Sequence, residues 1–215
     1  MEQDGRHEDM FHGYHQSLEK LPLPPPLERV SHLEAVDNND GENEEDGRYP
    51  LVATLKEEID QRIKDSLPDA LVIAGEGEPT LRRQAVLSIA RTYRSKVPVI
   101  RLVTNGLLVS SFSPDSFTKE LTQSGVNSVS VALMTADPVQ YEGLMQPVVL
   151  EDNNVVPSSS AHEQVCEFIR QAVHCELNVE ITGVDRPDVD KAKTEELAAS
   201  LGVTLPFRWR PFFKG

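Results

Sequence analysis

Residues 71–81 read LVIAGEGEPTL, a short apolar run that ends in two glycines interleaved with two glutamates and then a proline. The run Ala70–Ala74 is continuous and apolar, which predicts a strand buried on both faces. An apolar residue or alanine then recurs at every fourth position from Leu81 to Tyr93, which predicts a helix. A strand, a tight loop and a helix in this order are typical of an α/β sheet, in which ligands bind at the carboxyl ends of the strands.

The glycine loop does not match a phosphate-binding motif. A dinucleotide fingerprint needs a third glycine where Thr80 stands, and Glu76 and Glu78 would face a pyrophosphate with like charge. A Gly-Lys-Ser/Thr end, which a phosphate loop needs, is absent. Backbone carbonyls and carboxylates are hydrogen-bond acceptors, so the loop suits a cationic amine. Two interpretations stay open: a ligand that approaches the glycine backbone closely, or an ordinary strand-to-helix turn.

Predicted strands and helices alternate after residue 50. An amphipathic helix begins at Leu51, and a strand at 98–103 ends in the turn signal Thr104–Gly106. Ser113 is predicted to cap the next helix. The later elements are a strand at 128–133, a short helix after Pro138, a loop at 148–160, a helix at 161–173, a strand at 177–182, a helix at 189–201 and a strand at 207–213. This alternation predicts a parallel sheet.

The chain divides near residue 50 into two regions. Residues 1–50 contain a proline cluster, Leu21–Pro26, and an acidic run, Asp37–Asp46, with few apolar side chains to bury. We expect residues 1–50 to be mostly disordered and residues 51–215 to form the α/β domain. The role of the acidic run does not follow from the sequence.

Composition excludes several classes of protein. The chain has 215 residues and a formal net charge of −14, which argues against a nucleic-acid partner because binding phosphates requires basic patches. No apolar stretch reaches membrane-spanning length, and the start MEQDGRHEDM lacks the basic-then-apolar plan of a secretory signal. We therefore expect a cytoplasmic protein with a small-molecule ligand and no membrane partner.

Cysteines and histidines predict neither a disulfide framework nor a metal site. The only two cysteines, Cys166 and Cys175, are expected to be free thiols. His7, His12 and His15 are closely spaced, but no predicted fold holds them together and no cysteine lies nearby. We expect these histidines to be solvated.

Five segments together resemble the radical S-adenosylmethionine superfamily, specifically its TatD-associated branch. They are GEGEPTLR at 75–82, RLVTNGL at 101–107, VNSVSVAL at 126–133, ADPVQYEGLMQP at 136–147 and FRWRPFF at 207–213. The resemblance covers about residues 68–212, and its order and spacing are more specific than any single motif. A weaker similarity, HGYHQSLEKLP at 12–22, matches the family's segment just downstream of its cluster loop.

The resemblance implies a partial (β/α) barrel of parallel strands that binds S-adenosylmethionine across the strand ends. Its first strand and its cluster loop would be missing from this chain. In the family, the glycine-glutamate loop receives the amino group of the cofactor, and a later strand approaches the ribose. The implied cofactor-binding residues are Gly75, Glu76, Gly77, Glu78, Pro79, Thr104, Asn105, Ser130, Arg208 and Arg210.

The two arginines of the last predicted strand leave two interpretations open. Arg208 and Arg210 alternate with Phe207 and Trp209, so one side of this strand is basic and the other is apolar. If the arginines point inward, they would hold a carboxylate. Otherwise they form a solvated edge.

The chain departs from the family at the residues that perform its chemistry. The family's C-x-x-x-C-x-x-C loop holds a 4Fe-4S cluster, but this chain has no cysteine before Cys166, and Cys175 does not match the loop either. The cluster is therefore expected for the family and not supported by this chain. Ala132 and Met134 stand where the family carries polar side chains for the ribose.

Three functions remain open on the sequence alone, and it indicates neither a substrate nor an oligomeric state. The first is a radical S-adenosylmethionine enzyme by descent, truncated or degenerate and unable to perform radical chemistry as given. The second is a non-catalytic scaffold or binding protein with residual affinity for an S-adenosyl nucleotide. The third is an unrelated α/β enzyme with Glu76 or Glu78 as a general base. A TatD-type nuclease partner is suggested by the family's name only.

Overall fold

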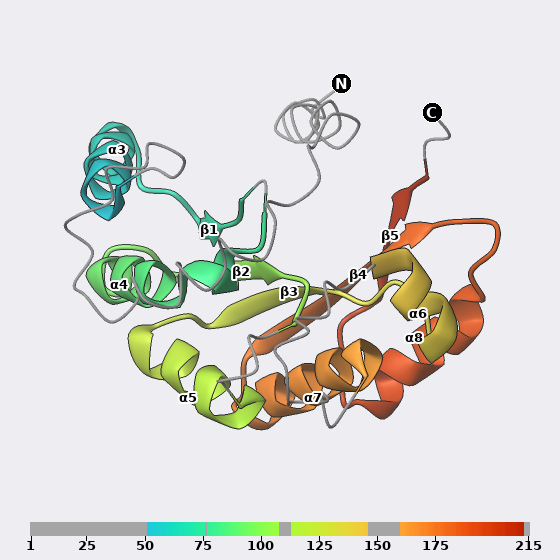
Figure 1. The fold of residues 1–215 in the computed structure, drawn as a ribbon. Coiled ribbons are helices and arrows are strands. Elements are labelled where there is room, and N and C mark those ends of the chain that lie inside the picture. Colours follow the sequence, from blue (N-terminus) through green and yellow to red (C-terminus); the bar gives the residue numbers. More distant parts are fainter. Residues whose placement is uncertain (1–50, 76, 108–112, 146–159, 213–215) are drawn as a thin grey trace, which may run out of the picture.

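The protein folds as a curled half-barrel of five parallel strands in the order β1-β2-β3-β4-β5 (Figure 1). The computed structural model describes residues 51–75, 77–107, 113–145 and 160–212. The strands are β1 (Leu71–Ile73), β2 (Ile100–Thr104), β3 (Ser128–Ala132), β4 (Asn178–Asp185) and β5 (Arg208–Pro211). The helices are α3 (Val52–Asp65), α4 (Arg83–Tyr93), α5 (Pro114–Ser124), α6 (Pro138–Met145), α7 (Ala161–His174) and α8 (Lys191–Ser200). The predicted partial barrel of parallel strands is confirmed.

Some predictions fall on residues that the structure does not describe. The N-terminal region 1–50, with its proline cluster and acidic run, lies outside the described residues, as does nearly all of the predicted loop at 148–160. The domain boundary at residue 50 therefore stays a prediction.

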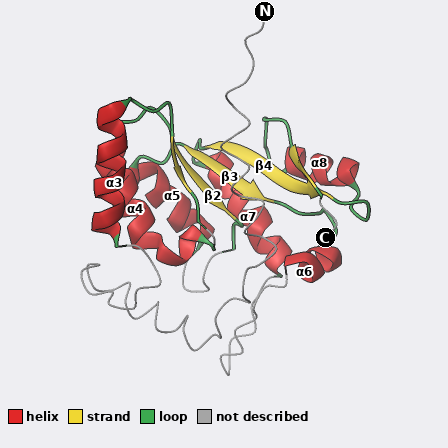
Figure 2. Ribbon diagram, turned by 90° about the horizontal axis from the view of Figure 1, so that it is seen from above, coloured by secondary structure: helices red, strands yellow, loops and turns green. Residues whose placement is uncertain are grey.

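Helices cover one side of the sheet. In Figure 1 the sheet curls with its concave side upward, while α4, α5 and α7 lie along the opposite, convex side, and Figure 2 shows the same helices from above. Leu102, Val131 and Ile181 are completely buried on the helix-covered side. Because side chains alternate along a strand, Arg101, Ser130 and other polar residues lie on the concave side.

The helix boundaries follow from capping residues. Ser113 caps α5 by accepting a hydrogen bond from Ser116 N at 3.2 Å, with Pro114 at the first helical position, as the sequence predicts. Ser160 and Glu163 form a capping box at the start of α7. Gly125 ends α5 with φ of 103°, a left-handed conformation that favours glycine.

Helix α3 confirms the predicted amphipathic helix after residue 50. Leu55 and Ile59 are among its half-buried apolar residues that pack against the core. The hydroxyl of Tyr93 on α4 donates to the carbonyl of Lys56 at 2.7 Å. These contacts fix α3 against α4 before the chain enters β1.

Two details of the region around the glycine loop were predicted wrongly. Val72, in the middle of β1, is 52% exposed instead of buried, because β1 has only β2 as a neighbour within the described sheet and its concave side faces no described helix. Residues 79–82 form a 3₁₀ helix before α4 begins, which leaves Leu81 39% exposed. The Glu78 carboxylate, which accepts from Thr80 N, and Pro79 together start this tighter turn.

None of the described helices combines the length and the apolar character that crossing a bilayer requires. The cytoplasmic location stays a prediction.

Candidate functional site

Glu78 connects the carboxyl ends of β1 and β2. Its Oε1 accepts hydrogen bonds from the Thr104 hydroxyl at 2.7 Å and from Thr80 N at 3.0 Å, and its Oε2 accepts one from Asn105 N at 2.7 Å. These donors use three of the about four lone-pair sites of a carboxylate. Glu78 is thus first a structural clamp, and the ligand-binding and general-base roles considered for it stay predictions.

The end of β2 is fixed by its own turn. The hydroxyl of Thr104 also accepts from Gly106 N at 3.0 Å, and Asn105 Oδ1 accepts from Leu107 N at 2.8 Å. Gly106 has φ of 75°, and a Cβ there would lie 2.8 Å from the Val165 side chain of α7. The structure thus places Thr104 and Asn105 beside Glu78, as expected of one strand-end site.

Gly75 and Gly77 need a different explanation from Gly106. Neither has a φ in the left-handed region, so glycine is not required there for the backbone conformation. Both are exposed, and a Cβ on Gly77 would meet nothing within 4 Å among the described residues. An ordinary turn therefore does not explain why glycine stands at these two positions. Close approach of another group to the backbone would explain it. Glu76, between them, lies outside the described residues.

Ser130 offers a polar atom on the concave side of the sheet. It pairs with Val103 on β2 and Glu180 on β4 in the strand register. The residue is only 2% exposed, yet its hydroxyl has no hydrogen-bond partner in the part of the chain that the structure describes. Ala132, the next residue on this side of β3, offers no polar side chain, and Met134, just past the strand, packs against the hydrophobic core.

Arg208 and Arg210 lie on the opposite edge strand of the described sheet from the Gly75 loop. They lie on β5 and pair with Thr182 and Val184 of β4, so four strand spacings separate β5 from β1. At about 4.8 Å per spacing, the path along the sheet is roughly 19 Å. This path follows a curled sheet and is not the distance across its concave side, so the expectation that these arginines share one site with the Gly75 loop stays a prediction.

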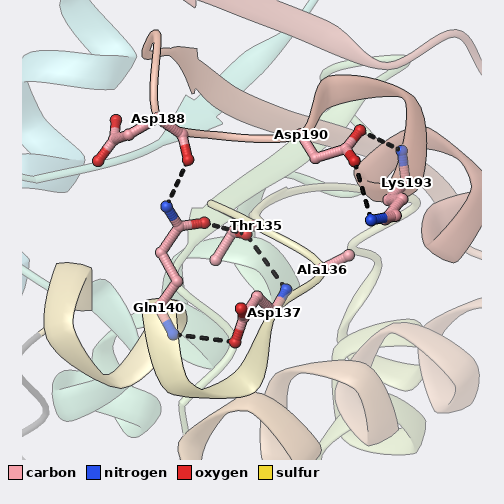
Figure 3. Close-up of a pocket in the computed structure, with 7 residues that line it drawn as sticks. All are labelled: Thr135, Ala136, Asp137, Gln140, Asp188, Asp190 and Lys193. Carbon is pink, nitrogen blue, oxygen red and sulfur yellow. Dashed lines mark hydrogen bonds and ion pairs between the residues drawn. The ribbon is translucent and has the colours of Figure 1, made fainter.

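A cavity of ≈ 410 Å³ lies between the loops that follow β3 and β4 (Figure 3). Sequence reasoning missed it. It is lined by Thr135, Ala136, Asp137, Gln140, Asp188, Asp190 and Lys193.

The polar groups of this cavity already bind one another. Gln140 Oε1 accepts from the Thr135 hydroxyl at 2.6 Å, and its Nε2 donates to the Asp188 carbonyl at 2.7 Å (Figure 3). Asp137 caps the start of α6, and Asp190 caps α8 and pairs with Lys193. The cavity is therefore a polar junction between two loops. Helix-capping residues in the sequence, such as Asp137, would have located the ends of these loops.

The residues do not fit an iron-sulfur cluster. Within the described ranges, no group of three or more His, Cys, Asp or Glu side chains is arranged to hold a metal ion, while His7, His12 and His15 lie outside these ranges. Cys166 is buried and Cys175 is half-buried, and both are free thiols, as predicted. The whole sequence has no further cysteine.

A buried polar cluster joins α6 and α7. The rings of His162 and Tyr141 pack edge to face with their centroids 5.4 Å apart. His162 Nδ1 lies 4.0 Å from Cys166 Sγ. Burial raises the pKa of Tyr141 and of Cys166. Burial also lowers the pKa of His162 from 6.5, against the opposing effects of the Thr135 backbone and nearby carboxylates.

The lowered pKa of His162 predicts a loss of stability in mild acid. The unfolded chain takes up a proton on this histidine near pH 6.5, whereas the folded protein does so only at lower pH. The free energy of unfolding should therefore fall as the pH decreases from about 6.5 to the folded-state pKa, and urea unfolding at several pH values measures it. His162→Phe should flatten this part of the pH profile, whereas His174→Phe, at an exposed position on the same helix, should not. An unchanged profile for His162→Phe would contradict the assignment.

Comparison with known proteins gives a partial match. No established protein-family profile matches the chain. Probable GTP 3',8-cyclases from two strains of Methanococcus maripaludis, C6 and S2, are 33% and 32% identical to it over 108 residues. The matched region is 49% of this chain but only 33% of each relative.

These similarities support the radical S-adenosylmethionine superfamily, to which GTP 3',8-cyclases belong. They do not support the TatD-associated branch. The family of these relatives uses S-adenosylmethionine and a 4Fe-4S cluster, and binding of either by this chain is not shown.

Proposed function

We propose that the chain is a radical S-adenosylmethionine-like protein that binds an S-adenosyl nucleotide at the carboxyl ends of β1 and β2. With the residues of this chain it performs no radical chemistry. One observation carries the proposal: glycine stands at positions 75 and 77 although the backbone conformation does not require it there. These glycines directly precede Glu78, which clamps the strand ends.

The residues present fit the nucleotide in two respects. Glycines at 75 and 77 would let the ammonium of the methionine part approach the backbone, where carbonyl groups are acceptors. The buried hydroxyl of Ser130, without a partner among the described residues, would pair with a hydroxyl of the ribose. Ala132 and Met134 add no hydrogen bond, which weakens this end of the site.

The cluster that supplies the electron for reductive cleavage in the superfamily does not fit this chain. Its ligands would be thiolates, and the two cysteines do not form the required set. We therefore assign no radical step to these residues. A truncated enzyme and a degenerate binding protein differ in the sequence encoded upstream of Met1, where an in-frame C-x-x-x-C-x-x-C would decide for truncation.

Membership of the TatD-associated branch, a TatD-type nuclease partner and a cytoplasmic location remain proposals. They rest on the five matching segments and on the composition of the chain. Copurification of the tagged chain with such a nuclease from its own cells tests the partner, and recovery of neither protein with the other would count against it.

Calorimetry tests the nucleotide site. S-adenosylmethionine and S-adenosylhomocysteine should bind in the high-micromolar range or more weakly, because each lost hydrogen bond to the ribose or the carboxylate costs about 1–3 kcal/mol. Gly77→Val should abolish this binding, because the branched side chain occupies the space of the approaching ligand. The fold should tolerate the substitution, since a Cβ at this position meets no described atom within 4 Å.

Gly143→Val is the matched control. Gly143 lies on α6, is exposed and has equally open space around its Cβ position in the described structure, so the variant should bind like the parent. If Gly77→Val also binds like the parent, the loop is only a turn. Nanomolar binding by the parent would contradict degeneracy. GTP, which the relatives' name suggests, is titrated as a third ligand, and binding of GTP alone would replace the S-adenosyl nucleotide in the proposal.

A further inference from the structure

The outer face of α4 is basic in a chain that is acidic overall. Residues 83–96, which are α4 and the turn after it, contain four Lys and Arg residues and no Asp or Glu. The whole chain has 21 basic and 35 acidic residues. Arg83 pairs with Glu120 on α5. The other three are exposed, and we call them the α4 basic surface: Arg91, Arg94 and Lys96.

Described carboxylates neutralise only part of the α4 basic surface. Lys96 Nζ pairs with Asp60 of α3 at 2.9 Å. Arg94 Nη1 donates to a backbone carbonyl, that of Gln123, at 3.3 Å. Within the described ranges the side chain of Arg91 forms no ion pair or hydrogen bond. Two guanidinium groups, three positions apart and therefore neighbours on the helix, thus have no carboxylate partner in the part of the chain that the structure describes.

The elements beside α4 do not cancel this positive charge. The last turn of α3 carries Arg62 and Lys64, which equal in number the two carboxylates that follow it, Asp65 and Asp69. On α5, Glu120 is already held by its ion pair with α4. The α4 basic surface can therefore accept further carboxylates.

The acidic run Asp37–Asp46 has the complementary charge. Its ten residues include six acidic residues and no basic one, and neither the fold nor the proposed nucleotide site gives it a role. Exposed ion pairs are individually weak and are screened by salt, so a contact of this kind depends on several pairs acting together. Six carboxylates facing two unpaired guanidinium groups and Lys96 meet that condition.

The run is long enough and close enough to reach the surface. Helices α3 and α4 lie side by side and in the same direction, because Lys56 contacts Tyr93 and, four residues later, Asp60 contacts Lys96 (Figure 2). The start of α3 is therefore about 12 Å from the level of Lys96 along the helix axis. The run ends five residues before Leu51 and begins fourteen residues before it, so an extended chain spans about 17 to 48 Å from α3.

We propose that the α4 basic surface binds the acidic run Asp37–Asp46 of the same chain. The tether favours this occupant over an acidic partner in solution, because a segment on a short linker acts at an effective concentration in the millimolar range. The donor forks of Arg91 and Arg94 suit carboxylates. Such binding requires opposite charge and reach, and it requires no fixed conformation of the run.

This surface is separate from the proposed nucleotide site. The end of α4 leads into β2, so the α4 basic surface lies toward the amino ends of the strands, whereas Glu78 and Thr104 lie at the carboxyl ends. The inference therefore does not rest on S-adenosyl nucleotide binding, and either proposal can fail without the other.

A nitroxide spin label on the acidic run tests the contact. Asn43→Cys provides the attachment point in a Cys175→Ser background, in which the remaining Cys166 is buried. At low ionic strength the label should broaden the ¹H–¹⁵N amide signals of residues 91–96 several times more than those of α8, which lies at the other end of the sheet (Figure 1). About 1 M NaCl should remove this difference, because it shortens the screening length to about 3 Å.

Matched variants separate this contact from general charge effects. Arg91→Gln with Arg94→Gln should remove most of the selective broadening. Arg170→Gln with Lys193→Gln also removes two exposed positive charges, on α7 and α8, and should leave the broadening unchanged.

Three results would overturn the proposal. The first is equal broadening of α4 and α8 at low ionic strength, which needs no arginine variant to fold. The second is selective broadening that persists in about 1 M NaCl or in the α4 double variant. In the third, a spin-labelled chain without ¹⁵N broadens residues 91–96 of an unlabelled ¹⁵N chain as strongly as the label within one chain does. That result would assign the run to a second copy.

Discussion

Glu78→Gln should lower the free energy of unfolding by about 2–4 kcal/mol, a large effect for a half-buried side chain. Its carboxylate accepts from the Thr104 hydroxyl, Thr80 N and Asn105 N, so it joins the ends of two strands and the start of the 3₁₀ helix. An amide has only one acceptor oxygen, so its NH₂ group must face a donor such as Asn105 N. Urea or guanidinium unfolding followed by circular dichroism measures the change.

Glu196→Gln is the control for Glu78→Gln. Glu196 is an exposed residue of α8, so Glu196→Gln should change the free energy of unfolding by no more than about 0.5 kcal/mol. If both variants unfold at the same denaturant concentration, Glu78 does not clamp the strand ends. In that case the proposed nucleotide site also loses its rigid support.

The sequence predicted those parts of the fold that depend on local signals. Short apolar runs between helical segments located the strands, and Ser113 followed by Pro114 located the start of α5. The exposure of Val72 was not predictable, because an apolar run does not show that its strand lies at an edge. The 3₁₀ turn at 79–82 depends on the Glu78 side chain, which a helical period does not include.

The candidate site was predictable only in its list of residues. Glu78 and Asn105 are 27 residues apart, and only the parallel pairing of β1 with β2 brings their strand ends together. The sequence shows that Arg208 and Arg210 alternate with apolar residues, but only the strand order places them on the opposite edge strand from β1. The ion pair between Arg101 and Glu180 could not be predicted either, because the two residues are 79 positions apart and lie on different strands. Contacts of this kind require the register of the whole sheet.

Anaerobic reconstitution of the purified chain with iron and sulfide should yield no 4Fe-4S cluster. A cluster of the superfamily needs three thiolates close together, and this sequence has only Cys166 and Cys175. Cys166 lies within α7 and Cys175 caps its end, so they are about 13 Å apart along the helix axis and cannot bind one cluster. Burial also raises the pKa of Cys166, which keeps it a thiol rather than a ligating thiolate.

Iron and sulfide analysis, with the visible absorption spectrum, measures the outcome of this reconstitution. The parent and the double variant Cys166→Ser/Cys175→Ser should retain the same small background of iron after gel filtration. Two irons per chain in the parent, lost in the double variant, would show that the cysteines of two chains together hold one four-iron cluster. The protein would then bind a cluster that can supply an electron, and the proposal of a binding protein without radical chemistry would be wrong. Equal background in both proteins, together with weak nucleotide binding, leaves the strand-end site as a ligand-binding remnant of the superfamily's barrel.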